Sequence, residues 1–145
     1  MSSAIYGVFV FTVALLFVTA YFLLGGLPLL ILKHDVPLDA RFIRGFFRVY
    51  YKAAFWAAVG ASASIALWGR FVLAMGAVAI AVLATLLQRH FLPVMEHLGA
   101  RIEANEGGAV ERFRRLHAAA LLINLGLLVL LVWGTIQLSR SIGPP

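Results

Sequence analysis

The stretch Ala118–Leu138, with the sequence AAALLINLGLLVLLVWGTIQL, contains no charged side chain. A helix of about 20 apolar residues crosses the roughly 30 Å hydrocarbon core of a bilayer. Three more stretches lack charge in the same way: Ala4–Leu32, Ala53–Trp68 and Phe71–Leu87. Flanking Arg and Lys side chains can extend to the interface and lengthen the shorter stretches. We therefore predict an all-α bundle of four transmembrane helices, with spans at about 4–32, 47–68, 70–90 and 117–138.

The composition supports a single membrane domain over residues 1–145. Hydrophobic residues make up 63% and charged residues 12% of the chain, against about 25% charged in a soluble domain. The net charge is +6, but the basic residues flank apolar spans and do not form a motif that binds a nucleic-acid groove. We therefore do not expect nucleic-acid binding. The absence of cysteine excludes disulfides and thiolate sites. The first apolar run is longer than a signal-peptide core of about 7–15 residues, so we expect it to be a retained helix.

The distribution of charge predicts the orientation. Five Lys/Arg lie in segment 33–52 and five in 88–117, so one side of a four-span bundle carries ten of the twelve. All six acidic residues lie on that side too. The positive-inside rule makes this side cytoplasmic and places both termini on the non-cytoplasmic side. Arginine outnumbers lysine ten to two, which favours a multi-pass protein of a bacterial cytoplasmic (inner) membrane.

Small residues predict how the spans pair. Ala53, Ala57 and Ala61 recur at every fourth position in the second span, and Ala77 and Ala81 do so in the third. Lipid gives helices no hydrophobic reason to associate, so closely packed small-residue faces supply the attraction. With a tight turn at 68–70, the two spans should form an antiparallel hairpin. In the first span, the segment Gly25–Pro28 predicts a kink or an interruption near the helix end.

The loop between the first two spans carries a basic helical face. Arg41, Arg44, Arg48 and Lys52 recur at intervals of three, four and four. One interpretation is a snorkelling anchor that bends into the second span. The other is an interfacial helix that docks on acidic lipid headgroups or on a partner protein. We predict these four residues, together with Arg89 and Asn124, as contacts to lipid or partner, and anionic headgroups and other membrane subunits as the partners.

Segment 88–117 predicts a helical hairpin that extends beyond the bilayer on the cytoplasmic side. Apolar residues keep helical spacing on both sides of Gly107-Gly108, the strongest turn signal, so the tip should lie near Asn105–Gly108. Folding the chain there brings His97 to nearly the height of His117, and His90 to the depth of Asn124. Two facing imidazoles can hold a haem iron or a transition metal. His97, His117 and His90 are therefore candidate cofactor ligands, with haem as the possible cofactor.

The alternative for these histidines is that each caps a helix end or sits among headgroups, as His34 at the end of the first span also can. On that interpretation the chain has no cofactor, and neither a metal site nor a catalytic residue is predicted. The acidic residues lack the Glu-x-x-His spacing of di-iron bundles. Asn124, inside the fourth span, is expected to hydrogen-bond a neighbouring helix.

The segment Phe113-Arg114-Arg115-Leu116-His117, followed by Asn124-Leu125, resembles the start of the last helix in a group of small four-helix membrane proteins. The group includes anthrone-oxygenase-like proteins and an uncharacterised family with a human transmembrane member. The exit from the third span, Gln88–Pro93, is similar in character, and the resemblance covers residues 86–138. It implies Arg89, His117 and Asn124 as family-like positions and leaves the activity open. The first span has no polar residue that matches a reactive site.

Two functions are compatible with these patterns. The first is a non-catalytic membrane subunit or assembly factor that packs through small-residue helix faces and presents a basic cytoplasmic face. The second is a small membrane oxidoreductase or oxygenase acting on a quinone-like or aromatic lipid-soluble substrate, with a histidine-based site. A transporter ranks third, because no charge inside a span and no paired broken helix marks a pathway.

Overall fold

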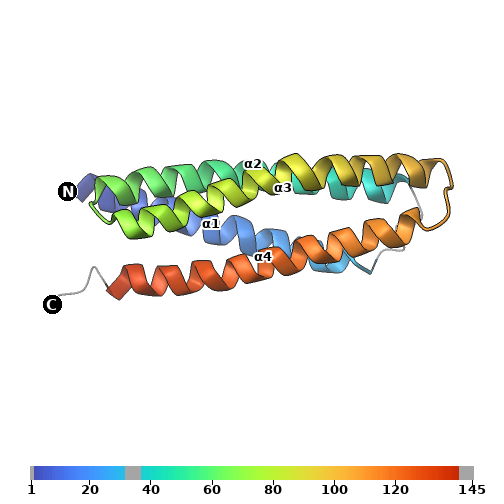
Figure 1. The fold of residues 1–145 in the computed structure, drawn as a ribbon. Helices are drawn as coiled ribbons and strands as arrows, with labels where there is room; N and C mark the ends of the chain where they lie inside the picture. Colours follow the sequence, from blue (N-terminus) through green and yellow to red (C-terminus); the bar gives the residue numbers. More distant parts are fainter. Residues whose placement is uncertain (1, 32–36, 141–145) are drawn as a thin grey trace.

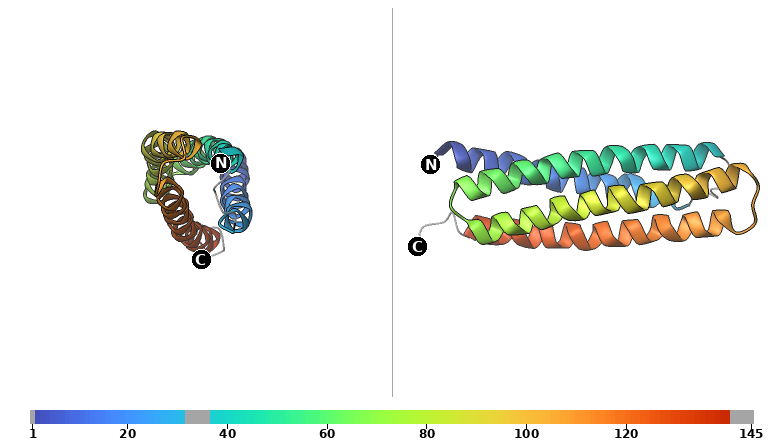
Figure 2. Two further views of the ribbon diagram at one scale, coloured as in Figure 1. Left: turned by 90° about the vertical axis from the view of Figure 1, so that its right-hand side faces the viewer. Right: turned by 45° about the horizontal axis from the view of Figure 1, so that its top comes forward.

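The computed structural model describes residues 2–31 and 37–140, and this part of the chain forms four long helices. They are α1 (Ser2–Leu29), α2 (Pro37–Leu67), α3 (Phe71–Glu103) and α4 (Ala109–Arg140). The helices run side by side and alternate in direction along a long bundle (Figure 1). Seen end-on, they form a ring in chain order, and each helix packs on its neighbours in sequence, with α4 closing against α1 (Figure 2). His34 lies outside the described residues.

Three of the helices are long and apolar enough to span a membrane: α1, α3 and α4. The chain is therefore a membrane protein with an all-α bundle, as predicted from the uncharged stretches. The helix α2 is less apolar, because its first half carries Asp39, three arginines and Lys52, and its second half consists largely of alanine and serine. At 1.5 Å per residue, the 33 residues of α3 extend over about 50 Å, well beyond the thickness of a hydrocarbon core.

The charged segments continue the spans as unbroken helices. The helix α2 begins at Pro37, ten residues before the predicted span, and Pro37 suits the first helical turn because its missing N–H would have no partner there. No separate interfacial helix precedes the span in the described residues, so the basic face is part of α2 itself. Similarly, α3 continues through Pro93 to Glu103. The predicted helical hairpin of α3 and α4 is confirmed, with positive φ angles at Asn105 (54°) and Gly108 (78°) in its tip.

The structure also confirms the predicted antiparallel hairpin, which α2 and α3 form. Its turn has Gly69 at φ 83°, in the left-handed region that glycine enters without steric cost, and the Arg70 guanidinium lies 5.3 Å from the Trp68 ring centroid. Most of the predicted small residues lie inside the bundle, whereas Ala53 is half-buried. The buried alanines are Ala54, Ala57, Ala58 and Ala61 of α2, and Ala74, Ala77, Ala81 and Ala84 of α3. The faces that the sequence offered for association are used within the chain.

The sequence predicted a kink or an interruption at Gly25–Pro28. The helix α1 is not interrupted at the two glycines but continues through them and ends at Leu29, directly after Pro28. A Cβ atom at Gly25 would lie 2.8 Å from the Phe46 ring, and one at Gly26 would lie 2.6 Å from a methyl group of Leu121. The two glycines therefore allow side chains of α2 and α4 to approach the backbone of α1. Their role is close packing, because a larger residue would require the Phe46 and Leu121 side chains to move.

Candidate functional site

A cluster of polar side chains lies in the apolar interior of the bundle. Thr19 of α1 and His117 and Asn124 of α4 are the fully buried polar residues of the described chain, with exposed fractions of 0–1%. Tyr50 and Tyr51 of α2 are buried beside them, at 4% and 1%. Burying such groups away from water is costly unless they find polar partners, and ionisable groups at membrane depth commonly mark functional sites. We call these five residues the polar core.

One hydrogen-bonded chain links α2 and α4 in the polar core. The Tyr50 hydroxyl donates to Oδ1 of Asn124 over 2.6 Å. The Asn124 amide nitrogen donates in turn to the Ala120 carbonyl, one helical turn earlier, over 2.7 Å. Because its N–H group is engaged by its own helix, the amide presents its oxygen to Tyr50. This bond is the interhelical contact that an asparagine within a span was expected to make. Asn124 was also predicted as a contact to lipid or partner, and the structure buries its side chain inside the bundle.

Two further hydroxyl groups lie next to these hydrogen bonds. Tyr51 lies near Asn124, and Thr19 lies near Tyr50, but neither hydroxyl completes a hydrogen bond with any residue that the structure describes. The polar core thus has unused donor and acceptor capacity in a place where water is scarce. Thr19 places one polar group of the first span beside this cluster, although no polar residue of that span was matched to a reactive site. Its short side chain gave no signal, because threonine within a helix commonly bonds its own backbone.

Aromatic rings surround the polar core. Phe22 of α1 stacks on Tyr50, with ring centroids 4.0 Å apart, and meets Phe47 edge-on at 4.8 Å. The Phe47 ring also packs edge-on against the His117 imidazole at 5.4 Å. Helical spacing explains this arrangement: Phe47, Tyr50 and Tyr51 fall on one face of α2, and His117 and Asn124 are seven residues, or about two turns, apart on α4. That spacing of seven was the available signal that the two α4 residues share an inward face.

A groove with an aromatic lining reaches the polar core from outside, between α1 and α2. It has a volume of about 560 Å³, and its lining includes Phe17, Tyr21, Phe22, Phe46, Tyr50 and, at the charged end, Arg41. Tyr50 belongs both to this lining and to the hydrogen bond with Asn124. Clefts of this size that combine apolar walls with a few polar groups are typical of sites for small molecules. The groove and the polar core meet at Tyr50, and we consider them together as the candidate site.

The three predicted cofactor histidines lie in different surroundings. His117 is buried in the polar core, whereas His90 and His97 of α3 are exposed. His97 does lie at the predicted height, because it lines a groove together with Leu116, but it is on the outer side of α3 and α4. In the described ranges, no group of three or more histidine and acidic side chains is placed to hold a metal ion. His117 faces the interior of the bundle and His97 faces its outer surface, so the rotation of the two helices separates these imidazoles.

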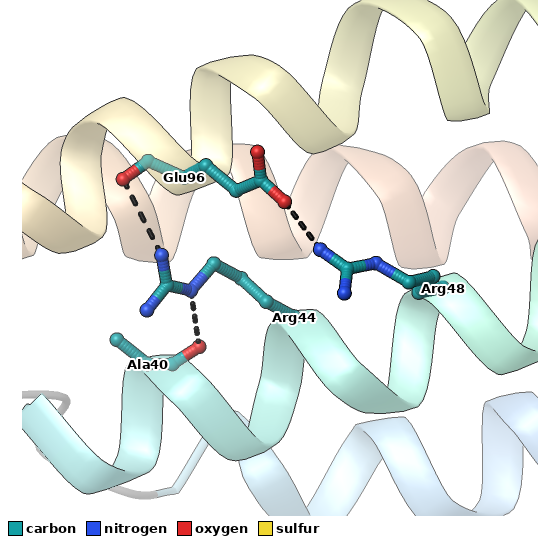
Figure 3. Close-up of polar contacts among 4 residues, drawn as sticks. All are labelled: Ala40, Arg44, Arg48 and Glu96. Atoms are coloured by element: carbon teal, nitrogen blue, oxygen red, sulfur yellow. Dashed lines mark hydrogen bonds and ion pairs between the residues drawn. The ribbon is translucent and has the colours of Figure 1, made fainter.

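The basic face of α2 is directed largely at α3. Arg48 contacts a carboxylate oxygen of Glu96 at 2.5 Å, and Arg44 donates to the backbone oxygens of Glu96 and Ala40 at 3.4 and 3.1 Å (Figure 3). Arg41 lies 3.9 Å from Glu103. Lys52 and Arg89 are exposed. Three of the predicted lipid or partner contacts, Arg41, Arg44 and Arg48, thus connect α2 to α3 at the charged end of the bundle.

The chain matches no protein-family model, no curated protein and no solved structure. The resemblance to small four-helix membrane proteins is therefore carried by the quoted residues alone. Two of its three family-like positions, His117 and Asn124, lie in the polar core, and the third, Arg89, is exposed at the surface.

Proposed function

We propose that α2 is a fourth span and that both termini lie on the non-cytoplasmic side. A small core cluster supports this assignment. It joins Ala61 and Ile65 near the end of α2 to Val8 near the start of α1, Ala74 near the start of α3 and Leu138 near the end of α4. Because α2 reaches the same level as the outer ends of the other three helices, it crosses whatever thickness they cross. The concentration of Lys/Arg at the opposite end makes that end cytoplasmic, in the inner membrane of a bacterium.

Single cysteines introduced into this cysteine-free chain test the orientation. We expect a membrane-impermeant thiol reagent to label Ser139→Cys in intact spheroplasts. Arg114→Cys, at the opposite end of α4, should be labelled only after the membrane is permeabilised. Both positions are exposed on the same helix, so they differ only in their side of the bilayer. Labelling of both in intact cells, or the reverse pattern, would contradict the proposed orientation.

For the function, we propose that the α1–α2 groove binds a quinone-like or aromatic lipid-soluble molecule that carries a hydroxyl group. The proposal rests on Tyr50, which lines the groove and also donates a hydrogen bond to Asn124. Because that proton is engaged, the hydroxyl oxygen retains only acceptor capacity. A phenol or quinol can donate to it, whereas a ring that offers only carbonyl or ether oxygens must displace Asn124. The aromatic lining favours stacking with a planar ring.

Paired probes test the binding site. In nanodiscs, we expect a long-chain hydroquinone to bind more tightly than its dimethyl ether, which has no donor. Tyr50→Phe should weaken hydroquinone binding about tenfold, near the upper range of one net hydrogen bond, and leave the ether unchanged. Asn124→Leu frees the Tyr50 hydroxyl to donate, so it should raise the affinity for the ether and narrow the difference between the two probes. The matched control is Tyr21→Phe, which removes an exposed hydroxyl from the same groove and should change affinity less than about twofold. Circular dichroism confirms that each variant is folded.

Two outcomes would overturn this assignment. One is equal affinity for the hydroquinone and its ether in the unsubstituted protein. The other is an identical effect of Tyr50→Phe and Tyr21→Phe, which would mean that the buried hydroxyl has no special part in binding.

The accessory-subunit hypothesis is the second candidate, and the braced charged end favours it. The bridges from Arg41 and Arg48 to α3 hold α2 and α3 together where they extend past the apolar spans, which suits a docking surface. The small-residue faces no longer support it, since they pack inside the bundle. Gentle purification with metal analysis and a visible spectrum tests it. If the chain is an accessory subunit, it should co-purify with a stoichiometric membrane partner and without a chromophore. Isolation of the chain alone would contradict this hypothesis.

A further inference from the structure

A second groove lies between α3 and α4, near the hairpin tip. Its volume is about 790 Å³. Its end toward the spans is apolar, with Pro93, Val94 and Ala119, and its far end carries Arg101, Arg112 and Arg115. Residues 93 and 101 are separated by about 12 Å along α3 at 1.5 Å per residue. The groove therefore changes from apolar to basic over a distance that exceeds the roughly 5–8 Å headgroup region on one side of a bilayer, so it is long enough to cross that region.

The charges around this groove are unbalanced. No acidic residue belongs to its lining. Arg101 contacts Glu106 and Arg115 contacts Glu111, each at 2.5 Å, and both glutamates lie outside the groove. Each guanidinium has five N–H donors, so one such contact leaves donors available while it orients the side chain. Arg112 forms no ion pair with any residue in the described part of the chain. His97 adds a further ring nitrogen to the same wall.

We propose that this groove binds one anionic phospholipid, with the phosphodiester at Arg112 and Arg115 and an acyl chain along the apolar floor. Charge complementarity supports the headgroup, because arginine donors match phosphate oxygens in a bidentate geometry. The apolar floor supports a lipid over a free phosphate, because Val94 and Ala119 lead directly into the spans. The inference rests on the proposed orientation, which sets this end at the cytoplasmic headgroups. It does not depend on the aromatic ligand of the α1–α2 groove.

Lipid titration of the purified full chain in detergent micelles, followed by native mass spectrometry, tests the proposal. We expect one phosphatidylglycerol to bind at least tenfold more tightly than phosphatidylcholine. Replacing both Arg112 and Arg115 by glutamine should remove that preference, since each basic residue near a lipid surface contributes roughly fivefold. Arg112→Gln alone should lower the preference about fivefold. Its matched control is Arg114→Gln, which removes an equal charge from an exposed neighbour outside the groove. It should retain the preference within about twofold.

A second variant and a competitor separate the alternatives. Ala119→Trp fills the apolar floor without changing charge and should also weaken phosphatidylglycerol binding. Inorganic phosphate at millimolar concentration should not displace the lipid. If it did displace phosphatidylglycerol, the groove would be a site for soluble phosphate, and the lipid proposal would be overturned. Loss of preference in Arg114→Gln equal to that in Arg112→Gln would mean diffuse attraction and overturn the site. Tyr50→Phe should leave lipid affinity unchanged, so this proposal and the aromatic-ligand proposal fail separately.

Discussion

Replacing Phe47 by alanine is expected to lower the free energy of unfolding of the bundle by about 3–5 kcal/mol. Phe47 is fully buried and joins three helices, with its ring 4.8 Å from Phe22, 5.4 Å from His117 and 5.9 Å from Tyr51. Removing the ring leaves a cavity between residues that are held by stacking and by the Tyr50–Asn124 hydrogen bond. Those neighbours cannot close the cavity without breaking their own contacts, so we expect the upper part of the range.

The measurement is reversible unfolding of the purified protein in mixed micelles, with SDS as the denaturant and helical circular dichroism as the signal. Phe42→Ala is the matched control, because Phe42 lies on the same helix with 61% of its surface exposed. Its removal should change the free energy of unfolding by less than about 0.5 kcal/mol, as at other surface sites. Equal losses in the two variants would mean that Phe47 does not fill the core as described.

Ala58→Leu is expected to destabilise the bundle by about 1–3 kcal/mol through overpacking. Ala58 has no exposed surface and lies in the half of α2 where small residues let neighbouring backbones approach closely. A leucine adds three carbon atoms that only helix separation can accommodate. Since lipid tails are as apolar as leucine, the larger side chain gains little from burial to offset the lost packing.

The same SDS titration measures this effect, with Ala63→Leu as the control. Ala63 is on the exposed side of α2, so a leucine there should leave the midpoint nearly unchanged. If Ala63→Leu were the more disruptive change, the small-residue face that matters would point outward. In that case a partner subunit would be its natural occupant, and the accessory-subunit hypothesis would regain its first support.

Much of the architecture was predictable because it depends on local composition. A run without charge such as Ala118–Leu138 is stable only in the interior of a bilayer, and glycines at 69 and 107–108 mark two of the places where the chain reverses direction. The predicted pairing of the second and third spans followed from alanines at every fourth position. The extent of α2 was less predictable, because its charged first half suits either an interfacial helix or a continuation of the span, and packing against α3 favours the continuation.

The sequence by itself determined that this chain is a helical membrane protein, where its helices turn, and that its charges gather at one end. The tertiary structure alone decided which polar residues meet. Hairpin register fixes the height of His97 relative to His117, but each residue turns the helix by 100°, and only the packed bundle sets that rotation. For the same reason Thr19, Tyr50, Tyr51, Asn124 and His117, spread over 105 positions, form one interior cluster that no local pattern reveals.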